Sequence, residues 1–193
     1  CSLENIEYEQ RIGRAVSASG APAPAVGELV RVNGRNGLLY QRINGQSMLE
    51  HFQRRPWRVL AYARQTASLL SALHRATLTM DIPAQRQRLQ HKLQQAAALP
   101  EGLRQKALMS LESLPDGNSI CHGDLHPGNI LLTAEGGTII DWIDATRGNP
   151  LADLARSAGG VVECMEIFYD LRTLLEKKNH RLIARDFMAE TPE

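Results

Sequence analysis

The chain has 193 residues, with 22 lysines and arginines against 21 aspartates and glutamates, so its formal net charge is +1. This balance argues against a dedicated nucleic-acid-binding protein, which would be strongly basic, and a hydrophobic content of 43% is too high for a disordered chain. Every run without a polar side chain is far shorter than the ~18 residues that span a bilayer, so no membrane segment is predicted.

The first part of the chain predicts a helix followed by a β-hairpin. Apolar side chains recur on one side of Leu3–Val16, as they do in an amphipathic helix, and a Pro-rich segment then ends it. Two strand-like runs, Glu28–Val32 and Leu38–Ile43, are joined by the turn-rich segment Asn-Gly-Arg-Asn-Gly, which favours a hairpin. The dipeptide at 44–45, Asn-Gly, then breaks the second strand and is expected to act as a hinge.

The rest of the chain is expected to be mainly helical, with a patch of short strands. The predicted helices cover Trp57–His74, Ala84–Ala98, Gly102–Leu114 and the residues from Leu151 onward. The predicted strands are Ser119–Cys121, Ile130–Leu132 and Thr138–Ile140. This order of elements predicts an α+β fold with two lobes, a small one over residues 1–45 and a mainly helical one over residues 46–193.

The clearest chemical signal lies among the short strands. Asp124 and Asn129 are five positions apart on a Pro/Gly-containing loop, and Asp141 follows twelve residues later at the end of another strand. A carboxylate can orient an acceptor hydroxyl and take its proton, and Mg²⁺ prefers hard oxygen ligands such as those of Asn and Asp. The spacing fits phosphoryl transfer, in which positioning and charge neutralisation dominate. It predicts Asp124 as the catalytic base and Asn129 and Asp141 as magnesium ligands.

Three segments resemble the motifs of the aminoglycoside phosphotransferase and choline kinase-like family of small-molecule kinases. They are His122–Asn129 (HGDLHPGN), Ile140–Trp142 (IDW) and Gly148–Ala155 (GNPLADLA). The resemblance implies a protein kinase-like bilobal fold, with an incomplete N-lobe and a mainly helical C-lobe. It also implies transfer of the γ-phosphate of ATP, with Mg²⁺, to a hydroxyl of a small molecule. Aminoglycoside, choline-like, sugar and amino-alcohol acceptors are all compatible with the sequence.

The same resemblance implies roles for further residues. His122 would support the catalytic loop, and Asp153 would be a buried acid that ties this loop to the following helix. Glu9 sits where the family has the helix glutamate that pairs with a phosphate-binding lysine. The strand whose backbone meets adenine would include Gln41, Arg42 and Ile43. Asp144 is either a second acidic group near the metal or a loop cap.

Two alternatives to an active kinase follow from the residues. The chain begins at the helix that carries Glu9, without the glycine-containing hairpin and lysine that precede it in the family, so it is expected to be N-terminally truncated. It could then be a non-catalytic remnant that binds a nucleotide or a partner. A metal-dependent hydrolase using His122, Asp124 and His126 is the other alternative, but it leaves Asn129 and Asp141 unexplained.

The remaining polar and aromatic residues are expected to be structural. Trp57 and Trp142 are interpreted as core or pocket-wall residues, and His74 as a partner of a helix C-terminal dipole. Cys121 is interpreted as a buried small hydrophobe because no activating neighbour is visible. No close cysteine pair and no export signal are present, which favours a reduced, cytoplasmic setting.

Overall fold

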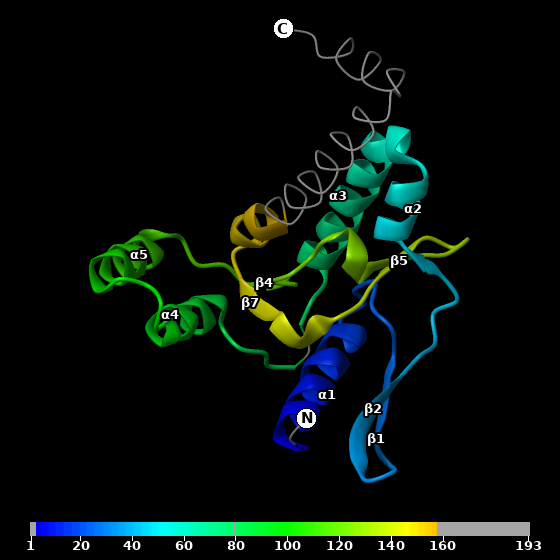
Figure 1. The fold of residues 1–193 in the computed structure, drawn as a ribbon, viewed down its shortest axis with the longest axis horizontal. Coiled ribbons are helices and arrows are strands. Elements are labelled where there is room, and N and C mark those ends of the chain that lie inside the picture. Colours follow the sequence, from blue (N-terminus) through cyan, green and yellow to red (C-terminus); the bar gives the residue numbers. More distant parts are fainter. Residues whose placement is uncertain (1–2, 79, 158–193) are drawn as a thin grey trace, which may run out of the picture.

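Helix α1 (Leu3–Ala18) packs against an antiparallel hairpin of β1 (Val26–Val32) and β2 (Arg35–Tyr40), in the lower part of Figure 1. This computed structural model describes residues 3–78 and 80–157. The helix was predicted from its apolar face, and Ile6, Ile12 and Val16 of that face are buried. The element is therefore confirmed, with a C-terminal end two residues beyond the predicted one.

The hairpin is tighter than the sequence predicted. Asn33 and Gly34 alone form the turn, both with positive φ (51° and 77°), and Val32 pairs directly with Arg35. An Asn-Gly pair favours this two-residue turn because both positions need a left-handed backbone. The second strand consequently begins at Arg35 and ends at Tyr40, so the predicted strand Leu38–Ile43 is displaced toward the C-terminus relative to the observed one.

A short strand and a short helix, β3 (Gln46–Ser47) and α2 (Met48–Arg54), follow the hinge and were not predicted. The Ser47 hydroxyl caps α2 by accepting the N–H of Glu50 at 3.2 Å. The 3₁₀ turn η1 (Pro56–Arg58) and helix α3 (Val59–Arg75) occupy the predicted helix Trp57–His74. Of the two roles expected for Trp57, core or pocket wall, the core is excluded, because Trp57 sits in the turn and is 70% exposed, while the buried face of α3 begins at Tyr62.

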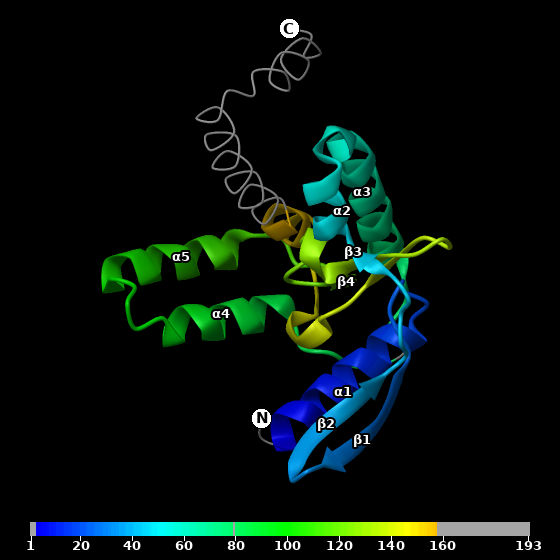
Figure 2. The same ribbon diagram turned by 45° about the vertical axis from the view of Figure 1, so that its right-hand side comes forward.

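Helices α4 (Gln85–Gln95) and α5 (Glu101–Ser113) form an antiparallel arm that projects from the rest of the molecule (Figure 2). Neither helix has a fully buried residue. The two helices predicted here, Ala84–Ala98 and Gly102–Leu114, are confirmed, the first with shorter bounds and the second shifted by one residue, and the first is largely solvated as predicted. Nowhere in the described ranges does a helix combine the length and the apolar run needed to cross a bilayer.

Two small sheets carry the loops of interest. In the first, β5 (Ile130–Leu132) lies between β3 and β6 (Gly137–Ile139), and in the second β4 (Ser119–Cys121) pairs with β7 (Thr146–Gly148). The 3₁₀ turns η2 (Pro127–Asn129) and η3 (Trp142–Asp144) connect them, and residues 150–157 are helical. The remainder of the predicted C-terminal helical region, residues 158–193, lies outside the described residues.

The apolar core lies directly beneath these loops. Ile120, Ile130 and Ile139, one from each of β4, β5 and β6, are fully buried. Leu125 from the loop and Leu73 from α3 join the same cluster. Each short strand is therefore anchored by an apolar side chain close to a predicted functional residue. The predicted α+β class is confirmed.

Candidate active site

The loop between β4 and β5 is held by its own polar groups. The Asn129 side-chain amide donates to the carbonyl of Asp124 at 3.0 Å, and the Asn129 N–H donates to the carbonyl of His126 at 2.9 Å. His126 Nδ1 in turn accepts the N–H of Gly128 at 3.1 Å. Because Asn129 uses its amide nitrogen within the loop, its side-chain oxygen is the atom left for a metal ion.

The end of β6 lies beside this loop. The Ile140 N–H donates to the carbonyl of Asn129 at 3.0 Å, and Ile130 pairs with Ile139 in the sheet. Asp141 comes next in the chain, with an exposed side chain and a left-handed backbone (φ 65°, ψ 64°). The structure thus brings the backbones of Asp124, Asn129 and Asp141 to one edge of the small sheets.

His122 joins the loop to β6 through both ring nitrogens. Nδ1 accepts the N–H of Asp124 at 3.1 Å, and Nε2 lies 3.0 Å from the carbonyl of Ile140, to which it must donate. These contacts select the neutral ring with its proton on Nε2. Burial lowers the pKa of His122 and outweighs the Ile140 carbonyl and the nearby carboxylates, which act in the opposite direction. Its ring is fully buried, so His122 contacts the loop and not the solvent.

Asp153 stabilises the start of the same loop by hydrogen bonds to its backbone. Its carboxylate accepts the N–H groups of His122 (3.0 Å) and Gly123 (2.8 Å) and contacts His74 Nε2 at 2.9 Å. Burial would raise the pKa of Asp153, but the hydrogen bonds from His74 and the two N–H groups lower it. His74 lies in the last turn of α3, and its ring is paired with this carboxylate, a partner that the dipole interpretation did not predict.

Cys121 completes a buried polar cluster next to Asp153. Its thiol lies with the ligand atoms of His74 and Asp153 within 4.8 Å of one another. Burial, with the charge of Asp153, raises the pKa of Cys121 to about 12, so the thiol stays protonated. Both oxygens of Asp153 already accept hydrogen bonds. The cluster is therefore interpreted as structural, and the expectation that Cys121 is buried is confirmed.

Asp144 is paired with cations of the arm. Its Oδ1 contacts Arg88 Nη2 and lies 3.1 Å from Lys92 Nζ. Burial alone would raise the pKa of Asp144, whereas hydrogen bonds from Lys92 and Arg88 lower it below its usual value. The sequence left two roles open for Asp144, a second acid near the metal or a loop cap. The observed contacts show a different one, an ion pair between the η3 turn and helix α4. The sequence contained no signal for it, because Arg88 lies 56 residues away.

Glu9 and the hinge residues belong to the part of the chain formed by α1 and the hairpin. The Tyr40 hydroxyl donates to Glu9 Oε1 at 2.7 Å. Burial, the Glu9 carboxylate and the charge of Asp141 raise the pKa of Tyr40. The Gln41 N–H donates to the carbonyl of Ala25 at 2.8 Å, and Arg42 and Ile43 follow outside any strand. Glu9 is thus joined to the strand that leads into the hinge.

An arginine that sequence reasoning missed lies beside the predicted base. Arg156 Nη2 is 3.5 Å from Asp124 Oδ1, and the two side chains are 46% and 48% exposed. Arg156 follows Asp153 by three positions in the same helical segment, so the buried contacts of Asp153 direct it toward the loop. The half-exposed Asp124 carboxylate is accessible from this side.

The hydrolase alternative finds no support. Both ring nitrogens of His122 are engaged within the protein, as is Nδ1 of His126. Among the described residues, the group of His, Cys, Asp and Glu side chains placed to share an ion is the cluster around Asp153, and it does not include Asp124. A His122–Asp124–His126 metal site is therefore not formed.

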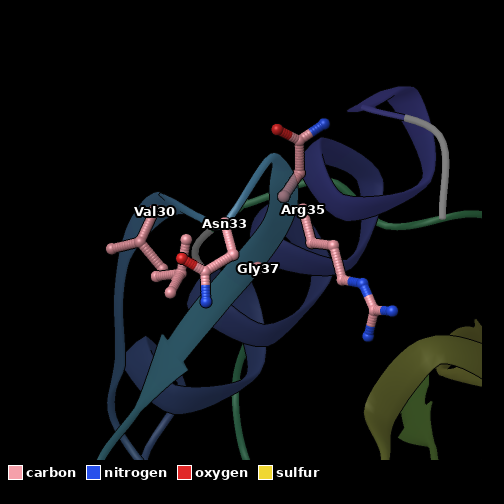
Figure 3. Close-up of a pocket in the computed structure, with 6 residues that line it drawn as sticks. Val30, Asn33, Arg35 and Gly37 are labelled. Carbon is pink, nitrogen blue, oxygen red and sulfur yellow. The ribbon is translucent and has the colours of Figure 1, made fainter.

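Two cavities lie away from the loop. One of about 510 Å³ is at the hairpin turn, where the side chains of Val30 and Arg35 extend to opposite sides of Asn33 (Figure 3). The other, of about 590 Å³, lies between the arm and residues 147–155, with Leu89, Leu111 and Leu151 in its wall. Neither is lined by Asp124, Asn129 or Asp141.

Comparison with known proteins identifies the family of this chain. A family model described as "Phosphotransferase enzyme family" matches residues 2–179. Among curated protein sequences, no match was found.

Solved structures of small-molecule kinases share the fold. An aminoglycoside-3'-phosphotransferase of type VIII is 23% identical, with a TM-score of 0.59 over 81% of this chain and 64% of that one. A choline/ethanolamine kinase family protein from Mesorhizobium loti is 20% identical, with a TM-score of 0.57 over 82% and 54%. A thermostable mutant of the aminoglycoside phosphotransferase APH(4)-Ia is 18% identical, with a TM-score of 0.57 over 77% and 59%. The chain thus spans little more than half the length of such proteins, and the predicted kinase-like fold is confirmed.

Proposed function

The chain belongs to the phosphotransferase enzyme family, and from this premise we propose that it transfers the γ-phosphate of ATP to a hydroxyl of a small molecule. The observation that carries the proposal is the pair of hydrogen bonds from Asn129 to Asp124 and from Ile140 to Asn129. They support the proposal because they hold the backbones of Asp124, Asn129 and Ile140, the residue before Asp141, side by side at one edge of the small sheets. A similar structure is a ternary complex with ADP and hygromycin B, which supports a nucleotide and a small acceptor as ligands.

In the proposed reaction, Asp124 is the base. The acceptor hydroxyl approaches the half-exposed carboxylate, which orients it and takes its proton. The acceptor oxygen forms a bond to the γ-phosphorus as the bond from that phosphorus to the β–γ bridging oxygen breaks, and ADP leaves. Arg156, beside Asp124, adds a positive charge on the acceptor side. His122 and Asp153 hold the loop backbone through hydrogen bonds to the N–H groups of residues 122–124. The backbone that carries the Asp124 carboxylate is therefore already in place before the acceptor binds.

Asn129 and Asp141 fit a magnesium ion by the chemistry of their donor atoms. One supplies a neutral amide oxygen and the other an exposed carboxylate without an ion-pair partner among the described residues. Mg²⁺ commonly takes one or two protein oxygens together with phosphates and water. When bound, it would neutralise the charge that develops on the phosphates.

The nucleotide would lie between the hairpin and the loops. Adenine would meet the backbone of Gln41, Arg42 and Ile43, and Glu9 would stand near the phosphates on the side of Tyr40. A reducing, ATP-rich compartment such as the cytoplasm suits the free thiol of Cys121.

A second candidate is a domain that binds nucleotide without transferring phosphate. It is favoured by the contact between Glu9 and Tyr40, because the Glu9 carboxylate is engaged by a hydroxyl where the family uses a lysine. Nucleotide binding without transfer, across all four acceptor classes, would support this candidate.

The proposal is tested with Asp124→Asn in the 193-residue chain. Loss of the base should lower phosphate transfer by ~10²–10⁴-fold, while calorimetry should show nucleotide affinity close to that of the wild type. The panel of acceptors covers an aminoglycoside, choline, a neutral sugar and an amino alcohol. Asp81→Asn, an exposed carboxylate outside the loop, is the matched control and should transfer normally. Undiminished transfer by Asp124→Asn would reject the role of Asp124.

A further inference from the structure

Arg88, on the inner end of the α4–α5 arm, contacts two other elements at once. Its Nη1 donates to the Tyr8 hydroxyl of α1 at 2.5 Å, and its Nη2 donates to the carbonyl of Ile143 in η3 at 3.1 Å. The same Nη2 forms the ion pair with Asp144. The guanidinium also lies 5.9 Å from the centroid of the Tyr8 ring. A partly buried cation therefore joins α4, α1 and η3.

The turn that Arg88 contacts begins at Asp141, whose backbone is strained. A non-glycine residue in the left-handed region is unfavourable and persists only when its surroundings determine it. Asp141 makes no side-chain cap for η3. The turn is held on one side by Trp142, whose Nε1 donates to the carbonyl of Ile139 at 2.9 Å. On the other side it is held by the contacts of Arg88 with Ile143 and Asp144.

Arg88 also determines the charge around the turn. Asp144 lies three positions after Asp141, and a free carboxylate there would add negative charge close to the proposed magnesium ligand. Arg88 and Lys92 both contact Oδ1 of Asp144. These ion pairs hold the Asp144 side chain against α4, and Asp141 is left as the exposed carboxylate beside the turn.

The contact with Tyr8 extends the connection to α1. Tyr8 precedes Glu9, whose carboxylate accepts the Tyr40 hydroxyl at 2.7 Å. Helix α1 also packs directly against η3. The helix with Glu9 and the turn with Asp141 thus share Arg88 as a common partner.

We propose that Arg88 is a positioning residue for the magnesium-binding turn, so that the α4–α5 arm is a structural part of the nucleotide site. The inference rests on the proposed function for the identity of the ion, and on the contacts above for the role of Arg88. Arg88 does not touch the metal or the nucleotide itself. It acts through Ile143 and Asp144 on the backbone of Asp141.

A matched pair of variants on α4 tests this role. Arg86 is two positions before Arg88 and donates to the carbonyls of Leu111 and Leu114 and to Asp116, so it joins α4 to the end of α5 without touching η3. Arg88→Gln and Arg86→Gln therefore remove the same kind of cation from the same helix. The first variant loses the contacts with η3, and the second loses the contacts with the end of α5. The Mg²⁺ concentration that half-saturates ADP binding is measured by calorimetry in the 193-residue chain.

Arg88→Gln should raise this Mg²⁺ concentration by up to ~10-fold, the lower end of the effect of losing a direct partner of a metal ligand, because Arg88 acts on Asp141 only through Ile143 and Asp144. ADP binding without Mg²⁺ should change little. Arg86→Gln should leave the requirement for Mg²⁺ unchanged even if its melting temperature falls. Arg88→Lys should be intermediate, because lysine keeps the charge but lacks the planar fork. An unchanged Mg²⁺ requirement in Arg88→Gln, or an equal rise in Arg86→Gln, would overturn the proposal.

A second measurement is independent of any ligand. The Ala145 N–H donates to the carbonyl of Trp142 at 3.0 Å within the turn, so its hydrogen exchange reports on η3 directly. Arg88→Gln should lose protection at Ala145, and Arg86→Gln should retain it. Retained protection in both variants would reject the positioning role. A wild-type chain that binds no ADP in the presence of Mg²⁺ would instead count against the proposed function, with the exchange result still deciding the role of Arg88.

Discussion

The β1–β2 hairpin and the region from β4 to β7 are both built from paired strands, but they are anchored differently. The hairpin strands have seven and six residues, and none of their side chains is buried. The strands of the loop region have only three residues each, yet Ile120, Ile130 and Ile139 are fully buried. Strand length therefore does not decide which side chains are buried, and buried anchors with polar contacts across the loops hold the candidate functional residues.

Trp142 gives the strongest test of this comparison, because we expect its substitution to have the largest effect on the free energy of unfolding. Its side chain is 3% exposed and packs edge to face on His122, with ring centroids 4.7 Å apart. Trp142→Ala should lower the free energy of unfolding by about 3–5 kcal/mol, because it leaves a cavity under η3. Denaturant-induced unfolding measures this loss.

Two controls accompany the Trp142 variant. Trp57→Ala removes an equally large but exposed ring, and Val32→Ala truncates an exposed hairpin side chain. Each should change the free energy of unfolding by no more than about 0.5 kcal/mol. A loss in Val32→Ala as large as that in Trp142→Ala would mean that the hairpin is anchored as firmly as the loop region.

Two glycines sharpen the comparison, because they share a backbone conformation but differ in their surroundings. Gly34 in the hairpin turn has φ +77° and open space around a Cβ. Gly123 in the loop between β4 and β5 has φ +79°, and a Cβ there would lie 2.7 Å from the Asp144 carbonyl oxygen. Gly34→Ala should cost about 1–2 kcal/mol from the left-handed conformation alone. Gly123→Ala should cost roughly 2–4 kcal/mol, because steric overlap is added. Thermal unfolding compares the two, and equal losses would contradict the role of close packing.

The smallest effect expected is a pH dependence near the ordinary pKa of histidine, to which the hairpin contributes no histidine. The pKa of His122 is lowered in the folded chain by burial, so the unfolded chain binds a proton first as the pH falls. The contribution of His122 to the free energy of unfolding should be complete above the ordinary histidine pKa of about 6.5. It should decrease as the pH falls below that value. His122→Asn should lose this part of the slope, and His91→Asn, an exposed control, should keep it. An unchanged slope in His122→Asn would rule out His122 as its source.

Much of the fold and of the candidate site could be predicted from local patterns. Helix α1 and the arm have helical periodicity over ten or more residues, and the spacing of Asp124, Asn129 and Asp141 is a local property of the chain. Strands β3 and β7 were missed because Gln-Ser and Thr-Arg-Gly contain none of the aliphatic residues that indicated β4, β5 and β6. Trp57 was interpreted as a core or pocket-wall residue because its spacing fits the apolar face of a helix, whereas the chain forms a 3₁₀ turn there and the side chain is exposed.

The sequence by itself determined the residue types of the site and the elements that carry them, because motif spacing and helical periodicity act over short distances along the chain. Only the tertiary structure decided which partners these residues have. Arg88 reaches Asp144 across 56 positions and Arg156 reaches Asp124 across 32. The physical reason is that hydrogen bonds and ion pairs depend on separation in space, which folding around the buried isoleucines determines.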